Sequence, residues 1–270
     1  MMQAKMMQAI RPRELFSQFL LPLGLVIACV ATIAWFQVPQ LQQLNHQSQN
    51  ATTAQIQAAT ESERVRLRVL QNTPTFGFDN LIADWVFLNF LQYFGDDVAR
   101  DKSDYLLSPD YFKVILGRNP YFLETYTFLS TSSNIYAGKA EEAVAIAKKA
   151  LQSLKPTAPK GSYYAWRQVA IDQLLFLGDP QAARQSFLTA AEWARIQGNT
   201  QVADLSQQTA DFLQRNPNSR YAQIAAWSMV LTSAPDDRTR KVAVRRIEEL
   251  GAQVKQNPDG AFSIVPPAQD

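Results

Sequence analysis

One pattern occurs twice in this chain, as GKAEEAVAIAKKA at 138–150 and as GDPQAARQSFLTA at 178–190. Each copy begins with a glycine, which lets the backbone turn through positive φ. Residues five, nine and twelve positions later share one stripe of a following helix; they are Ala143, Ala147 and Ala150, and Ala183, Phe187 and Ala190. The pattern predicts two helix hairpins. Because a lone hairpin cannot bury its apolar face, we expect a stack of such units, an architecture that usually binds other proteins.

The composition excludes several classes of function. The chain has 270 residues, 47% of them hydrophobic, as in a globular protein of one or two domains. Its net charge of +2 is accounted for by the first fourteen residues, so the remainder is formally neutral and poorly suited to bind nucleic acid. The single cysteine, Cys29, excludes an intrachain disulfide. The single histidine, His46, excludes most metal and triad chemistry, and we expect it to be a solvated linker residue.

A long apolar segment near the N-terminus predicts a membrane anchor. Phe19 to Phe36 reads FLLPLGLVIACVATIAWF without a charge, and with its apolar neighbours it gives a span over 15–38. Three basic residues precede the span and no charge follows before Glu61, so the positive-inside rule places the N-terminus in the cytoplasm. The body is then periplasmic or lumenal, at a plasma or thylakoid membrane. The predicted membrane contacts are Phe19, Leu20, Leu23, Val26, Ile27, Trp35 and Phe36.

Two alternatives to a permanent anchor stay open at this stage. A cleaved signal peptide has the same basic and apolar regions, although its apolar run is shorter. A lipoprotein signal is the second, because Val26 to Cys29 is similar to the motif after which a cysteine is acylated. The residues after Cys29 remain apolar through Phe36, which favours the anchor over lipidation of Cys29.

The rest of the chain divides by composition. The predicted segments are a basic arm (1–14), the anchor (15–38), a Gln-rich stalk (39–73), an aromatic capping helix with an acidic loop (74–104), a helical repeat domain (105–252) and a mobile tail (253–270). The aromatic helix ends near Gly95. We interpret it either as a buried helix that closes the stack or as a contact for a partner or the bilayer.

Helix start and stop signals place the repeat helices. The first predicted hairpin is Pro120 to Tyr136 with Ala140 to Leu154, and the second is Ser162 to Leu177 with Pro180 to Ile196. Asp179 and Pro180 give the second hairpin an N-cap and a proline at the first helical position. Further helices are predicted over Thr200 to Gln214, Arg220 to Thr232 and Asp236 to Leu250. The sequence therefore predicts an all-α fold.

The hairpins resemble tetratricopeptide repeats (TPR), which have 34 residues, a turn glycine, an A-x3-F step and a closing proline. Gly178, Ala183, Phe187 and Ala190 match these positions, whereas the first copy has Ala147 in place of phenylalanine and closes at Pro156. The first helices depart from the family, since Thr127 and Arg167 stand where it has a large aromatic. The resemblance covers roughly 105–252 and is to the membrane-anchored type of bacteria and cyanobacteria.

The resemblance implies a concave surface, lined by the first helix of each hairpin, that binds partner proteins. Its exposed positions are expected at Tyr121, Thr125, Tyr126, Asn134, Tyr163, Tyr164, Trp166, Arg167 and Asp172. Of these, the predicted partner-binding residues are Tyr121, Tyr126, Asn134, Tyr163, Tyr164, Trp166 and Arg167. Tyrosine, tryptophan and arginine are the residue types that most often anchor interfaces.

Few residues suggest catalysis. The chain has no glycine-rich phosphate loop, and its histidine is distant from any candidate nucleophile. Asp79 and Asp84 are a conceivable carboxylate pair, but residues five apart point to different helix faces. We therefore predict no catalytic residue, cofactor or metal, and a membrane-tethered scaffold that assembles or docks a membrane complex. The alternatives are a constitutive accessory subunit of a large, possibly photosynthetic, membrane complex and, third, an extracytoplasmic enzyme.

Overall fold

A computed structural model describes residues 23–39, 51–234, 236–256 and 262–270. The chain divides into two units, Met1–Thr52 and Thr53–Asp270.

The first unit contains a helix over residues 23–39. It covers most of the predicted anchor, and its apolar side chains are exposed, including the predicted membrane contacts Leu23, Val26, Ile27, Trp35 and Phe36. Cys29 is exposed on the same helix. Among the described residues, no helix combines the length and the apolar character needed to cross a bilayer. The arm 1–14, the start of the span with Phe19 and Leu20, and His46 lie outside the described residues.

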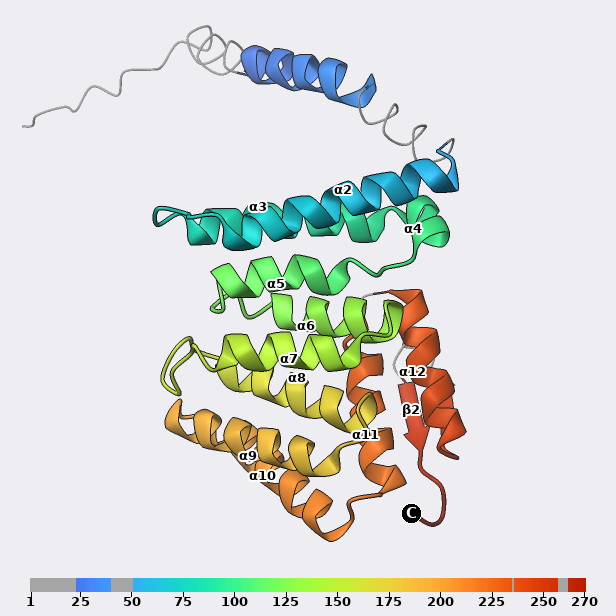
Figure 1. The fold of residues 1–270 in the computed structure, drawn as a ribbon. Coiled ribbons are helices and arrows are strands. Elements are labelled where there is room, and N and C mark those ends of the chain that lie inside the picture. The colour runs from blue at the N-terminus through green and yellow to red at the C-terminus, as the bar shows by residue number, and fades with distance from the viewer. Residues whose placement is uncertain (1–22, 40–50, 235, 257–261) are drawn as a thin grey trace, which may run out of the picture. The chain divides into compact units, whose positions relative to one another are not determined.

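The second unit is helical apart from one hairpin, so the all-α prediction is confirmed (Figure 1). Its elements are α2 (Thr53–Asn72), α3 (Asp79–Gly95), α4 (Asp97–Ser103), α5 (Ser108–Arg118), α6 (Thr125–Ser130), the π-helix η1 (Thr131–Tyr136), α7 (Ala140–Leu151), α8 (Ser162–Leu175), α9 (Pro180–Ile196), α10 (Thr200–Arg215), α11 (Arg220–Thr232), α12 (Asp237–Glu249), β1 (Gln253–Gln256) and β2 (Phe262–Val265). β1 and β2 pair antiparallel, with Val254 opposite Ile264.

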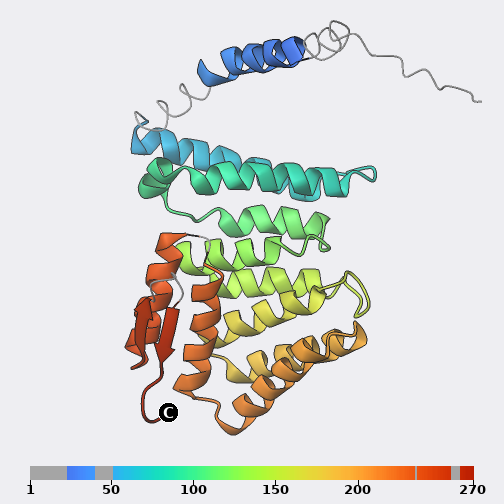
Figure 2. The same ribbon diagram turned by 180° about the vertical axis from the view of Figure 1, so that it is seen from behind.

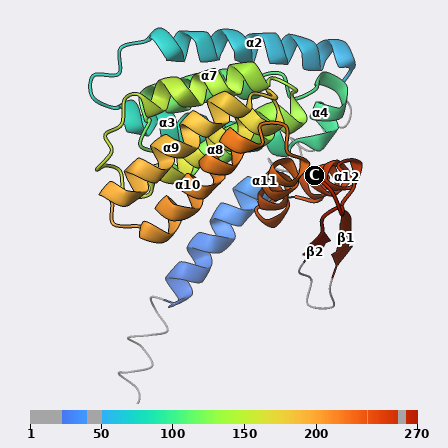
Figure 3. The same cartoon turned by 90° about the horizontal axis from the view of Figure 1, so that it is seen from below.

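The helices of this unit follow one another along a stack. α2 and α3 lie at one end, and α5 to α10 succeed them toward the other end (Figure 1, Figure 2). α11, α12 and the β-hairpin lie at one side of the stacked helices, as the view along the stack shows (Figure 3). There α12 contacts η1 and α11 contacts α8. The C-terminal helices therefore border the middle of the stack as well as its last members.

The two copies of the repeated pattern form the predicted turns. Gly138 and Gly178 have φ of +63° and +62°, a region that only glycine adopts readily. The backbone N–H after each glycine donates to a carbonyl six residues earlier, Lys139 to Ser133 at 2.7 Å and Asp179 to Gln173 at 3.0 Å. The stripe residues that follow are buried in both copies: Ala143, Ala147, Ala150, Ala183, Phe187 and Ala190.

Two predictions about the N-terminal part of this unit are wrong. The predicted stalk is a packed helix from Thr53 onward, because Ile56 and Leu67 are buried and Tyr111 donates its hydroxyl hydrogen to Glu63 Oε1 at 2.9 Å. Because mostly polar residues separate Ile56 from Leu67, the sequence shows no clear helical spacing of apolar residues in this segment. The predicted acidic loop is α4, which begins where the Asp96 side chain accepts a hydrogen bond from the Ala99 N–H.

The tail, predicted to be extended or mobile, forms extended strands that pair and fold back, so the mobile alternative is wrong. β1 and β2 form within it, and the Asp270 carboxylate accepts hydrogen bonds from the Ser219 hydroxyl and from the Tyr221 N–H at the start of α11. Arg220 donates to the Gln269 carbonyl at 2.8 Å. Between the strands, 257–261 lie outside the described residues. Four-residue strands leave little periodicity in the sequence by which to recognise them.

Candidate functional site

A narrow groove lies where α6, η1, α8 and α11 meet, with a volume of about 30 Å³, room for only a water molecule or two. Both polar and apolar side chains line it, among them Thr127, Thr131, Gln168, Ile171, Met229 and Ser233. The predicted helix from Pro120 starts only at Thr125 and continues as the π-helix from Thr131. This change of helix type occurs on the wall of the groove.

An apolar cavity of about 390 Å³ lies next to the groove, beside α3. Thr127, Thr131 and Ser233 line both the groove and the cavity, so the two are adjacent. The other lining residues of the cavity are Phe90, Phe94, Phe128, Ser132 and Asp236. Three phenylalanine rings against small hydroxyl side chains form a space suited to an apolar group.

A buried polar cluster forms the floor of the groove. Asp172 Oδ1 accepts hydrogen bonds from Ser130 Oγ at 2.7 Å and from Gln168 Nε2 at 3.1 Å. Burial raises the pKa of Asp172 to about 7, against the lowering effect of these bonds. The carboxyl group therefore changes charge near neutral pH, and the cluster joins α6 to α8.

The π-helix leaves polar atoms unpaired next to the cavity. The wider turn of the π-helix is closed by a hydrogen bond in which the Ala137 N–H donates to the Ser132 carbonyl, five residues earlier, with 3.1 Å between nitrogen and oxygen. The hydroxyls of Ser132 and Ser133 and the Asn134 Oδ1 are buried and have no hydrogen-bond partner among the described residues. Single π-turns are frequent at functional sites, and an unpaired buried polar group costs about 1–3 kcal/mol. Ser132 also lines the cavity, where a bound group could pair with it.

Aromatic and charged side chains hold the start of α12 against the border of the cavity. Tyr136 donates its hydroxyl hydrogen to Asp236 Oδ1 at 2.6 Å, and Arg238 lies over the rings of Tyr136 and Tyr105 at 4.5 and 5.4 Å. Phe94 meets the edge of Tyr136 with 4.8 Å between ring centroids. Burial raises the pKa of Tyr136, and the bond to Asp236 raises it further. This cluster joins η1 to the start of α12.

The structure separates the positions expected to be exposed into three groups: exposed, buried and partly buried. Tyr121 and Tyr164 are exposed, as expected. The expected exposure is wrong for the buried residues Thr125, Tyr126, Asn134, Tyr163 and Asp172. Tyr126 and Tyr163 bury their rings, and each hydroxyl is still hydrogen-bonded. Tyr126 donates to the Pro120 carbonyl at 3.0 Å, and Tyr163 accepts from the Asn199 amide at 2.9 Å.

Trp166 and Arg167 are partly buried on α8. Trp166 packs edge to face on Trp193, with 5.8 Å between ring centroids. Arg167 donates to Ser206 Oγ at 3.4 Å, and burial lowers the pKa of its guanidinium. Arg167 thus joins α8 to α10, and neither residue lines the groove or the cavity. Sequence reasoning missed Thr127, Thr131 and Ser132, although a run of serine and threonine in the middle of a helix is a weak signal of irregular backbone.

The conceivable carboxylate pair is not a site. Asp79 accepts a hydrogen bond from Arg118 at 3.2 Å, and Asp84 is exposed on the far side of α3. Arg118 also donates to the Leu70 and Thr73 carbonyls, both at 2.7 Å. Asp79 therefore helps to close the α2–α3 turn.

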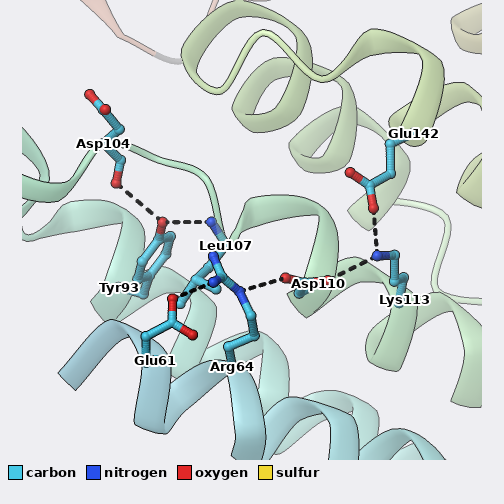
Figure 4. Close-up of polar contacts among 8 residues, drawn as sticks. All are labelled: Glu61, Arg64, Tyr93, Asp104, Leu107, Asp110, Lys113 and Glu142. Atoms are coloured by element: carbon cyan, nitrogen blue, oxygen red, sulfur yellow. Dashed lines mark hydrogen bonds and ion pairs between the residues drawn. The ribbon is translucent and has the colours of Figure 1, made fainter. Parts of the chain in front are cut away.

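Further polar contacts make this end of the stack rigid. Lys113 on α5 lies between Asp110, at 2.9 Å, and Glu142 of α7, at 2.5 Å (Figure 4). The Tyr93 hydroxyl of α3 accepts a hydrogen bond from the Leu107 N–H at 3.1 Å (Figure 4). Together these bonds connect α3, α5 and α7.

The far side of α3 is apolar and exposed. Ala83, Val86 and Phe90 bury one face of the helix. The opposite face and the preceding turn form what we call the outer apolar face, with 39–89% exposure of each side chain: Phe76, Phe78, Leu81, Trp85, Leu88 and Leu91. The aromatic helix thus packs on the stack with one side and presents a second apolar surface with the other.

No family model, curated protein or solved structure matches this chain.

Proposed function

We propose that this chain is a membrane-tethered scaffold whose apolar cavity receives a side chain of a partner protein. The cavity of about 390 Å³, which adjoins the small groove, is the observation that carries the proposal. A partner's apolar side chain fills the cavity, and its neighbouring backbone groups pair with polar groups at the border, such as the Ser132 hydroxyl. Stacked helical hairpins that resemble TPR units commonly bind proteins in this way.

The tether is the second part of the proposal. The uncharged helix over residues 23–39, which follows the basic arm 1–14, supports insertion of the predicted span 15–38 into a plasma or thylakoid membrane. Confinement to a membrane raises the effective concentration of a partner in the same membrane. The scaffold then assembles or docks subunits of a membrane complex.

Site-specific crosslinking tests the cavity. A photoreactive phenylalanine analogue replaces Thr127, which lines both groove and cavity, or Gln208, an exposed residue of α10 that serves as the matched control. We expect a discrete crosslinked partner from position 127 only. We also expect the product to disappear when Thr131→Trp fills the cavity. A product that persists with Thr131→Trp, or that forms equally from position 208, contradicts the assignment of the cavity.

A further inference from the structure

The outer apolar face of α3 is too extended to be an ordinary surface irregularity. Leu81, Trp85 and Leu88 follow one another at intervals of three or four residues, so they form one line along the helix. Elsewhere on the described stack, exposed large apolar side chains occur singly, as do Tyr164, Ile196 and Leu205, or as a pair on one helix, as do Val65 and Val69 of α2. Contiguous apolar surface on a protein marks a contact with another molecule or a membrane.

The face is held in a fixed orientation by the opposite side of the same helix. The Phe90 ring meets the Phe112 ring edge to face, with 4.7 Å between centroids. The turn that carries Phe76 and Phe78 is flanked by Arg118, which donates to the Thr73 carbonyl and to Asp79. A partner of this face therefore meets a preformed surface.

The length of the linker limits how far α2 can lie from an inserted span. Residues 40–52 connect the apolar helix of the first unit to α2, and a fully extended chain of that length spans at most ~45 Å. If the first segment is inserted, α2 begins within that distance of the bilayer. α3, which is ~25 Å long, packs near it in the same unit.

The residue types of the face match the interfacial layer of a bilayer. Tryptophan favours the headgroup level, and leucine and phenylalanine enter the acyl boundary beneath it. The Arg66 guanidinium lies 4.9 Å from the centre of the Trp85 ring and pairs with Glu63 at 2.5 Å, so this cation can meet a lipid phosphate at the border of the face. Asp84 and Gln92 lie within the face at helical spacing and are exposed, so the face rests in the headgroup layer and only its leucine, tryptophan and phenylalanine side chains reach the acyl boundary.

We infer that the outer apolar face docks on the surface of the lipid bilayer. The inference rests on the proposed tether, because the tether is what keeps α3 close to lipid. The stack is then held against the membrane, with the cavity in a defined orientation toward partners in that membrane.

Fluorescence of single-cysteine proteins tests the inference. The full chain is labelled with an environment-sensitive fluorophore at native Cys29, at Leu88→Cys in a Cys29→Ser background, or at Leu205→Cys in the same background. Leu205 is the matched control, an exposed leucine on α10 at the other end of the stack (Figure 1). Each protein is reconstituted into vesicles of phosphatidylcholine and phosphatidylglycerol, with nitroxide lipids as quenchers. Circular dichroism checks that each variant retains the parent's helix content.

The expected result is a shift of the position 88 emission to shorter wavelength and its quenching by nitroxides near the top of the acyl chain, with neither effect at position 205. Equal emission at 88 and 205, quenched or not, overturns the docking. If the docking is overturned but Cys29 is quenched by deep nitroxides, the proposed tether is supported and only the docking fails. If position 88 is quenched and Cys29 is not, the face binds lipid and the proposed tether fails.

Discussion

The two copies of the repeated pattern, forty positions apart in the sequence, share a turn but differ in the helix before it. In the second copy α8 is a regular α-helix, and Asp172 is satisfied by Ser130 and Gln168. In the first copy the corresponding residue is Ser132, which lies in a π-helix with its hydroxyl unpaired. The same glycine turn thus follows a π-helix in the first copy and an α-helix in the second. The irregular copy is the one that lines the cavity, so the binding site coincides with the departure from the repeat.

The largest effect is expected at the position where the copies differ most in size. Phe187 of the second copy is buried where the first copy has Ala147. We expect Phe187→Ala to lower the free energy of unfolding by about 3–5 kcal/mol through loss of contacts and a cavity. Urea denaturation followed by helical circular dichroism measures the change. Ala147→Phe is the reciprocal variant, with an expected loss of about 1–3 kcal/mol from overpacking. A loss below about 1 kcal/mol for Phe187→Ala means that the second hairpin is not closely packed there.

The buried carboxyl group predicts a pH dependence. In the folded state the pKa of Asp172 is raised to about 7, while in the unfolded chain a carboxyl ionises near ~4. Between these values the folded state binds more protons, so its stability falls as pH rises toward neutrality and is level above it. Asp172→Asn keeps hydrogen-bonding groups without the charge, so we expect it to be more stable than the parent by roughly 2–4 kcal/mol at about pH 8.

The comparison variant for Asp172 is Asp204→Asn, which changes an exposed carboxyl on α10. Denaturation at about pH 5 and about pH 8 separates the two sites. If the parent keeps the same stability at both pH values, Asp172 is ionised in the folded protein throughout this range.

The smallest expected effect is at the N-caps. Asp179 accepts a hydrogen bond from the Ala182 N–H at 2.9 Å, whereas Lys139 at the same place in the first copy makes no side-chain cap. Lys139→Asp gives α7 the cap that α9 has, and we expect a gain of about 1 kcal/mol in unfolding free energy. Lys139→Ala controls for removal of the lysine alone. Equal stability of the two variants indicates that α7 frays independently of its cap.

The parts of the fold that follow from local chemistry could be predicted from the sequence. Gly138 and Gly178 are required by positive φ, and the bounds Pro180–Ile196 and Arg220–Thr232 follow from capping residues and helical spacing. The π-helix could not be predicted, since it depends on which carbonyl each N–H meets once α5, α7 and α12 pack against it. The burial of Tyr126 and Tyr163 was missed because a tyrosine can bury its ring when one neighbour accepts or donates a hydrogen bond at its hydroxyl.

The contact between Tyr136 and Asp236 has a consequence for folding. The two residues are one hundred positions apart in sequence, yet the hydrogen bond and Arg238 join η1 to the start of α12. A simple repeat array gains its stability from nearest neighbours and can unravel from either end. Here the last helices close a long loop over the middle of the array, at an entropic cost that grows only slowly with loop length. If the array unfolds from its C-terminal end, the contact of α12 with the π-helix therefore breaks early. The N-terminal and C-terminal halves of the array are coupled in this way and unfold in one cooperative transition.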